Sequence, residues 1–254
     1  MTAAPALTTL SARNLTRRFR RTEVIHGISL ELRRGEVLGL VGHNGAGKST
    51  TLQMLSGALL PDSGQIEVCG HDLLRQPINA KTHIGFLPET PPLYREMCVD
   101  DYLAFAARLH LVPPGRTVDA LTEAKLRCGL QDAGDKFIGT LSKGYQQRVG
   151  IAQAIIHSPD VIILDEPTVG LDPEQIRDIR ALIRELGDTH SVILSTHLIS
   201  EVESICDRVE IMQEGRLIYG GSKQDMMQLG NGRMKLEEIF IRITENHAPG
   251  ISAP

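Results

Sequence analysis

The chain has 254 residues, of which 41% are hydrophobic and 23% are charged, so it is neither a disordered nor a collagen-like chain. A chain of this length buries a sizeable core without disulfide bonds. Its net charge of −4 excludes the broad basic field that many nucleic-acid-binding proteins carry, and we expect no nucleic-acid partner.

The cysteines and the apolar segments restrict the class of protein further. The four cysteines lie far apart and form no CxxC pair: Cys69, Cys98, Cys128 and Cys206. This spacing argues against a disulfide framework and against a zinc site, and it fits a reducing compartment. The first residues lack the pattern of a secretory signal, and no window approaches ~18 uninterrupted apolar residues. We therefore expect any membrane role to depend on a partner.

The strand patterns, taken in chain order, predict two kinds of sheet. Residues 8–20, 24–32 and 64–68 read as β structure separated by turns, which predicts an antiparallel β lobe. Residues 37–41, 161–164 and 191–195 are short, nearly continuous apolar runs, as in parallel strands buried on both faces. Helical patterns at 48–58 and 173–186 follow the first two of these runs. This order predicts an α/β fold with a mostly parallel core sheet.

The middle of the chain reads mostly as helix. Residues 100–111 and 118–129 have helical periodicity, and a further helix is expected from Ser142, a good N-cap residue, to about residue 157. We expect a helical lobe inserted between core strands. Residues 246–254, rich in Pro, Gly, Ala and Ser, are expected to be frayed.

A phosphate-binding loop is the most specific motif. The pattern GxxxxGK[ST] lies between a predicted strand and a predicted helix, the context that this motif requires. Its residues, with the one that follows, are Gly42, His43, Asn44, Gly45, Ala46, Gly47, Lys48, Ser49 and Thr50. The glycines let the backbone N–H groups turn toward phosphate oxygens, and the helix N-terminus adds positive charge. We expect Lys48 to reach the β and γ phosphates and Ser49 to ligate Mg²⁺; the alternative is a chance glycine-rich turn.

Two carboxylates end the second apolar run. Asp165 and Glu166 are expected at the carboxyl end of a parallel strand, where ligands of open α/β sheets bind. We expect Asp165 to hold Mg²⁺ through water and Glu166 to act as general base on the attacking water. By themselves, two acids after a strand are ordinary surface residues. His197 ends the third run at the same edge, and we expect it to bind the γ phosphate rather than serve a structural role.

Together with the segment LSKGYQQR at 141–148, these motifs resemble the nucleotide-binding subunit of ATP-binding cassette (ABC) transporters. The resemblance covers residues 8–243 and follows the family's order: phosphate loop, Q-loop, signature, Asp-Glu pair, D-loop and switch histidine. It implies a P-loop NTPase core of RecA-like fold, ATP and Mg²⁺ as cofactors, and ATP hydrolysis. One nucleotide-binding domain is predicted over residues 1–254. Its core and β lobe span about 8–89 and 158–220, its helical signature lobe about 90–157, and its C-terminal extension about 221–254.

The resemblance also assigns roles to single residues. Phe19 takes the place of the aromatic residue that stacks on adenine; the alternative is an ordinary core phenylalanine. Ser142 and Gly144 match signature positions that contact the γ phosphate bound by the other subunit. Asp172 matches the D-loop at the dimer interface, a role compatible with capping the following helix.

Two positions depart from the family pattern. The signature has Lys143 and Tyr145 where the family has Gly and Gln. At the Q-loop position the chain has Glu89 rather than Gln. We expect Glu89 to ligate Mg²⁺ or to orient water, although it adds negative charge close to the triphosphate.

The SKGYQQR signature, the DEPTVGLDP run and the LEEIF segment at 236–240 resemble the ABC-2 export branch. This implies a homodimer with a second ATP-binding subunit and a separate polytopic permease subunit, at the cytoplasmic face of the cell membrane. Residues 93–97 lie where the family docks its membrane partner, or they pack the helical lobe. Two alternatives stay open: a soluble ABC ATPase acting on ribosomes or DNA, and a nucleotide-binding regulator that barely hydrolyses ATP.

Overall fold

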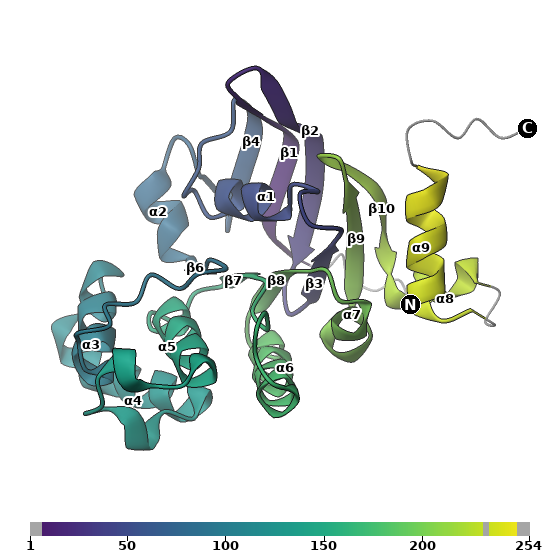
Figure 1. The fold of residues 1–254 in the computed structure, drawn as a ribbon. Coiled ribbons are helices and arrows are strands. Elements are labelled where there is room, and N and C mark those ends of the chain that lie inside the picture. The colour runs from purple at the N-terminus through teal and green to yellow at the C-terminus, as the bar shows by residue number, and fades with distance from the viewer. Residues whose placement is uncertain (1–6, 231–233, 248–254) are drawn as a thin grey trace, which may run out of the picture.

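A six-stranded sheet forms the centre of the computed structural model, which describes residues 7–230 and 234–247 (Figure 1). Its order is β10-β9-β3-β8-β7-β6; β9 through β6 are parallel, and β10 is antiparallel to β9. The strands are β3 (Val37–Val41), β6 (Ile84–Leu87), β7 (Val161–Asp165), β8 (Ser191–Thr196), β9 (Arg208–Gln213) and β10 (Arg216–Ser222). Every residue of β3, β7 and β8 is buried, as the continuous apolar runs predicted.

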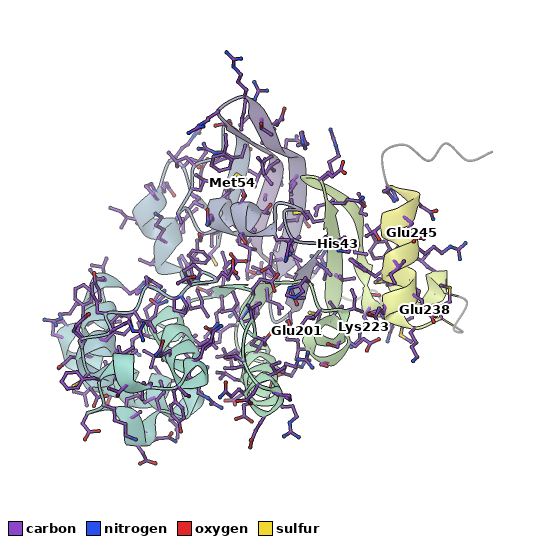
Figure 2. The ribbon with its side chains drawn as sticks, viewed as in Figure 1. His43, Met54, Glu201, Lys223, Glu238 and Glu245 are labelled. Atoms are coloured by element: carbon purple, nitrogen blue, oxygen red, sulfur yellow. The ribbon has the colours of Figure 1, made fainter. Side chains whose placement is uncertain are left out.

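A second, antiparallel sheet of order β2-β1-β4-β5 covers one face of this core. Its strands are β1 (Thr8–Phe19), β2 (Thr22–Arg33), β4 (Ser63–Val68) and β5 (His71–Asp72). Helix α1 (Lys48–Leu55) lies between the two sheets, and its Met54 is fully buried there (Figures 1 and 2). The predicted antiparallel β lobe is thus present.

Alternate side chains of the core strands serve two separate apolar clusters. Leu38 and Leu40 pack with α1 and the antiparallel sheet, whereas Val37 and Val41 join a cluster formed with the remaining helices. This division follows from the period of two in a β-strand. The sheet is therefore covered on both faces, which holds its carboxyl-terminal edge in place for a site.

The helices outside α1 form the helical lobe and the second covering layer. Beyond β6 lie α3 (Val99–Leu109), α4 (Thr117–Cys128) and α5 (Lys143–Ile155), with short 3₁₀ turns at Pro114–Arg116, Gln131–Ala133 and Ile138–Thr140. Helices α6 (Pro173–Gly187) and α7 (Ile199–Ile205) lie against the core sheet on the side away from α1. The predicted helical lobe and the helix at 173–186 are confirmed.

The C-terminal helices pack at the β10 edge. Helix α8 (Lys223–Leu229) begins with a capping box between Ser222 and Asp225, and α9 (Leu236–Asn246) follows it (Figure 1). The rings of His43 in the phosphate loop and Phe240 in α9 lie 5.6 Å apart. Of the segment expected to be frayed, residues 248–254 lie outside the described residues.

The observed boundaries differ from the predictions in a few places. Helix α1 ends at Leu55 rather than at residue 58, because Ser56 caps it and Gly57 turns the chain with φ +69°. The patterns did not predict β5, β6, β9, β10, α2 (Pro77–Thr82), α7, α8 or α9, which are mostly short. Within the described part of the chain, no helix has the length and apolar character needed to cross a membrane.

Candidate nucleotide site

The loop of residues 42–49 joins the end of β3 to the start of α1. Gly45 and Gly47 have φ values of +83° and +105°, which glycine adopts without the strain that a side chain would add. A Cβ atom at Gly47 would lie 2.7 Å from Met212 Cε and 2.8 Å from Ile25 Cδ1. The backbone conformation therefore favours glycine at residue 47, and a side chain there would also displace the ends of Met212 and Ile25.

Lys48 places a buried ammonium group at the mouth of this loop. Its Nζ donates to the carbonyl oxygens of Gly42 at 2.8 Å and His43 at 3.4 Å. The same Nζ lies 3.2 Å from Glu166 Oε1, and both side chains are less than a tenth exposed. The position and charge suit a group that binds phosphate oxygens.

The acid pair stands at the end of β7, beside the loop. Asp165 Oδ1 accepts hydrogen bonds from Ser49 Oγ at 3.1 Å and from Ser195 Oγ at 2.6 Å. Ser195 Oγ in turn accepts a hydrogen bond from the backbone N–H of Glu166 at 2.9 Å. Ser195, on β8, was missed by the sequence analysis. Its register opposite Asp165 fixes the orientation of both acids.

Glu166 links the phosphate loop to the end of β8. Its φ of +47° is unusual for a residue other than glycine, and such strain is concentrated at functional sites. Oε2 lies 2.9 Å from His197 Nδ1. Within residues 7–230 and 234–247, Oε1 accepts no hydrogen bond, although Lys48 Nζ is within ion-pair range. One buried carboxylate oxygen thus remains available to a ligand in the pocket.

These groups line a pocket of about 390 Å³. Its lining residues are Val24, Asn44, Gly45, Gly47, Lys48, Ser49, Thr50, Glu89, Glu166, Val169 and His197. The structure therefore brings together most of the phosphate loop, the general-base candidate, the histidine and Glu89. Val24 and Val169 were not predicted, because a valine in a loop or at a strand start carries no chemical signal.

Other predicted residues do not line the pocket. Phe19 is 43% exposed, and the Arg17 guanidinium lies 5.0 Å from its ring. It is therefore not the core phenylalanine of the alternative interpretation, and its contact with adenine stays a prediction. Gly42, His43 and Ala46 belong to the phosphate loop without lining the pocket, and Asp165 lies just behind it through its bond to Ser49.

The signature residues lie at the start of α5, away from the pocket of their own chain. Ser142 is the N-cap of α5, and its Oγ accepts from the backbone N–H of Tyr145 at 3.4 Å. A Cβ atom at Gly144 would meet the side chain of Gln175 at 2.6 Å. The signature therefore contacts the helix that follows the D-loop.

Asp172 begins this helix, α6. Its Oδ1 accepts from the backbone N–H groups of Glu174 at 3.1 Å and Gln175 at 2.9 Å. The N-cap role that we considered for Asp172 is thus observed. The cap thus fixes the point at which α6 begins, directly after the D-loop residue Asp172.

The chain matches the ABC transporter family over residues 25–169. The linearmycin resistance ATP-binding protein LnrL of Bacillus subtilis is 36% identical over 85% of this chain and 70% of its own length. A structure described as the ATP-binding subunit of an ABC transporter covers 93% of this chain and all of its own, with a TM-score of 0.84 and 30% identity. CbiO1 of Clostridium perfringens, described as part of the transporter complex cbiONQ, covers 95% of this chain and 96% of its own. Its TM-score is 0.77 and its identity 31%.

These comparisons agree with the site, and they lend no support to a ribosome- or DNA-directed ATPase. They confirm the P-loop NTPase fold expected from the strand order and the phosphate loop. They also confirm the kind of enzyme that the resemblance implied, an ATP hydrolase. The chain belongs to the ATP-binding subunits of ABC transporters.

Proposed function

We propose that this subunit hydrolyses MgATP at a site shared between two chains and thereby powers a membrane permease that exports its cargo. The observation that carries the hydrolytic part is the position of Glu166. Its carboxylate is buried between Lys48 Nζ at 3.2 Å and His197 Nδ1 at 2.9 Å, and one of its oxygens has no hydrogen bond from the residues that the structure describes.

Lys48, Glu166 and His197 each have a distinct task in our proposal. Lys48 and the loop N–H groups bind the β and γ phosphates and stabilise the charge that develops on them. Glu166 Oε1 accepts the proton of the attacking water. His197, held by Glu166 Oε2, donates to the γ phosphate and fixes the carboxylate.

The donor set around Ser49 fits Mg²⁺. The Ser49 hydroxyl and the Asp165 carboxylate are hard oxygen ligands 3.1 Å apart, and Glu89 adds a carboxylate to the pocket lining. These residues would hold the ion, which neutralises phosphate charge when bound. Ser195 keeps Asp165 oriented by its hydrogen bond.

The partner chain in this proposal is a second copy. Ser142 and Gly144 do not line the pocket of their own chain, so in our proposal they contact the nucleotide bound by the second copy. The N-terminus of α5, with its serine cap, suits a γ phosphate presented from a facing subunit. ATP then stabilises the closed dimer, and hydrolysis removes that stabilisation, which is the source of mechanical work.

The proposed direction is export, and the proposed partner is a separate permease at the cytoplasmic face of the membrane. CbiO1, which is described as part of the transporter complex cbiONQ, supports work in a complex with other subunits. Resistance to linearmycin, for which LnrL is named, is an outcome that outward transport of that compound gives. Tyr94, 53% exposed and edge-on to Phe105 at 5.7 Å, offers an aromatic contact for the permease on the helical lobe.

Capture from membranes tests this proposal. Tagged Glu166→Gln protein with bound ATP is recovered from detergent-solubilised membranes of its own host, and the proteins that co-purify with it are identified. The control is Lys48→Ala, which lacks the phosphate-binding ammonium group. We expect a stoichiometric polytopic membrane protein with the first variant. Ribosomal or DNA-repair partners without a membrane protein would contradict the transport assignment. Phosphate release unchanged by Glu166→Gln would instead support a regulator that barely hydrolyses ATP.

A further inference from the structure

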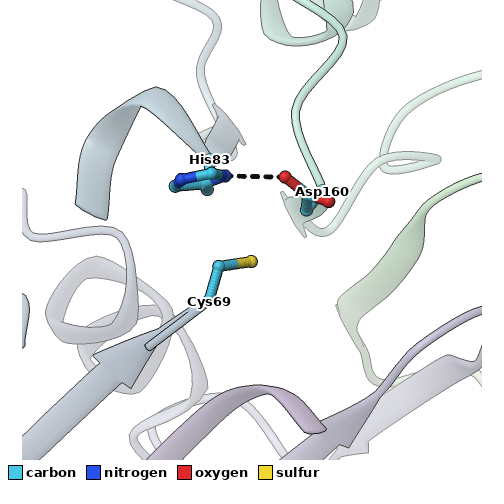
Figure 3. A group of neighbouring side chains, drawn as sticks. All are labelled: Cys69, His83 and Asp160. Carbon is cyan, nitrogen blue, oxygen red and sulfur yellow. Dashed lines mark hydrogen bonds and ion pairs between the residues drawn. The ribbon is translucent and has the colours of Figure 1, made fainter. Parts of the chain in front are cut away.

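Three potential metal ligands from distant segments meet at the edge of the core opposite the nucleotide site (Figure 3). They are Cys69, just after β4; His83, at the end of α2; and Asp160, just before β7. One ligand atom from each lies within 4.8 Å of the other two. The nucleotide site uses none of them, since its residues stand at the carboxyl ends of the strands.

We propose that Cys69, His83 and Asp160 form a zinc site. Thiolate and imidazole are the ligands that Zn²⁺ prefers, and a carboxylate completes a common set of three protein ligands. Three protein ligands leave a fourth position for water. The side chains of His83 and Asp160 are 32% and 42% exposed, so the site is open to solvent on one side.

The distances suit such a site. His83 Nδ1 lies 2.7 Å from Asp160 Oδ2. The Cys69 side chain lies below this pair in Figure 3. Zinc bonds of ~2.0–2.3 Å in tetrahedral geometry separate ligand atoms by about 3–4 Å. Zinc would therefore move His83 Nδ1 and Asp160 Oδ2 slightly apart from 2.7 Å, whereas the ligand atom of Cys69 already lies within 4.8 Å of both. The metal would replace the proton that His83 and Asp160 share.

The backbone of each ligand-bearing segment is anchored to a sheet or a helix. The N–H of Cys69 donates to Thr9 O at 2.8 Å, the carbonyl of His83 accepts from Val161 N at 2.9 Å, and that of Asp160 accepts from Ser191 N at 2.9 Å. The rings of His71 and His83 are stacked 5.5 Å apart, which holds the second ligand in orientation. A site built on anchored segments loses little entropy when it binds its ion.

The metal would join the two sheets. Cys69 extends the antiparallel sheet, whereas His83 and Asp160 precede β6 and β7 of the core sheet. The absence of a CxxC spacing argued against zinc, but that argument covers ligands that are close in sequence. Here the fold brings together residues separated by more than a dozen positions, which no local pattern shows.

Cobalt titration tests the site. Co²⁺ is added to chelator-treated protein without a histidine tag, and the thiolate-to-cobalt charge-transfer absorption is recorded; Zn²⁺ is then added to displace the cobalt. Only a thiolate gives this absorption, so histidines and carboxylates at the nucleotide site do not contribute. We expect one saturable cobalt site per chain, abolished by Zn²⁺ and by Cys69→Ser. His83→Gln and Asp160→Asn should each weaken binding by about 100-fold.

Cys98→Ser is the matched control, because Cys98 is also free and half-buried but stands apart from the cluster. It should leave the cobalt absorption unchanged. Circular dichroism and thermal unfolding of the metal-free variants show that each one folds. Zinc should also raise the unfolding temperature of the unmodified protein but not that of Cys69→Ser. Absence of the absorption in the folded protein, its survival in Cys69→Ser, or unchanged affinity in both His83→Gln and Asp160→Asn would overturn the proposal.

Discussion

Asp165 and Ser195 are register partners on the neighbouring parallel strands β7 and β8, and a hydrogen bond of 2.6 Å joins their side chains. The same serine oxygen accepts the backbone N–H of Glu166. One hydroxyl thus orients the proposed metal ligand and the proposed general base together. Both Asp165 and Ser195 are buried, so water does not replace this hydroxyl.

Ser195→Ala should therefore impair both stability and turnover. It leaves Asp165 Oδ1 with one donor fewer and the N–H of Glu166 without its partner, which costs about 1–3 kcal/mol of unfolding free energy. Loss of a group that orients metal ligands lowers kcat by about 10–100-fold. Urea unfolding and steady-state phosphate release measure the two effects.

Ser191→Ala is the matched control on the same strand. Ser191 is equally buried and accepts from the N–H of Gly35 at 3.3 Å, far from the nucleotide site. It should lower stability and leave kcat unchanged. A kcat for Ser195→Ala equal to that of Ser191→Ala would show that Ser195 does not position the acids.

The two left-handed glycines of the phosphate loop should differ in their tolerance of alanine. Gly45 has open space where a Cβ would stand, so Gly45→Ala carries only the backbone strain of ~1–2 kcal/mol. Gly47→Ala adds contacts with Met212 and Ile25, which cost a further ~1–3 kcal/mol. Urea unfolding of the two variants compares them directly; equal free-energy losses would mean that Met212 and Ile25 move aside freely.

His157 should make the fold sensitive to acid. Its ring is stacked on His110 at 3.9 Å, and its Nε2 bonds to Ile84 O at 3.1 Å. Its Nδ1 is buried and has no hydrogen-bond partner in the described part of the chain. Burial, reinforced by His110, lowers the pKa of His157 from 6.5 to about 3. Its contribution to stability is therefore present above pH 6.5 and is lost as the pH falls below 6.5 toward 3.

His157→Gln should make the unfolding free energy less dependent on pH. Between about pH 6 and pH 4 the slope should fall by ~1.4 kcal/mol per pH unit, which corresponds to about one proton fewer taken up on unfolding. The unfolding free energy in urea at a series of pH values measures it. His110 and His190 also have pKa values lowered by burial, so a smaller slope of the same sign should remain. His247→Gln, at an exposed position in the chain, is the control and should leave the slope unchanged. An identical slope in His157→Gln and the unmodified protein would contradict the assignment.

The local parts of the site were predictable from the sequence because the residues of each motif are close together in the chain. The loop at 42–49, the acids after 161–164 and His197 after 191–195 all sit where an apolar strand ends, and the parallel fold brings such ends together. The capping role of Asp172 was predictable for the same reason: it depends on Glu174 and Gln175, two and three residues further along the chain.

Relationships that depend on strand register were not predictable. The pairing of Asp165 with Ser195 needs β7 and β8 aligned to the residue, and the meeting of Cys69, His83 and Asp160 needs three separate elements in place. The contact of Phe19 with adenine stays a prediction: its ring lies against Arg17, and it is not among the residues that line the pocket.

Dimer formation by Glu166→Gln tests the central claim most directly. The molar mass of the Glu166→Gln protein in solution is measured by light scattering, with and without MgATP. Two double variants are measured in the same way: Glu166→Gln with Ser142→Ala, and Glu166→Gln with Ser222→Ala. Both serines cap a helix, but only Ser142 stands in the signature. We predict an ATP-dependent dimer for Glu166→Gln that the Ser222→Ala change preserves and the Ser142→Ala change weakens. A Glu166→Gln protein that binds ATP and stays monomeric would contradict a site shared between two chains.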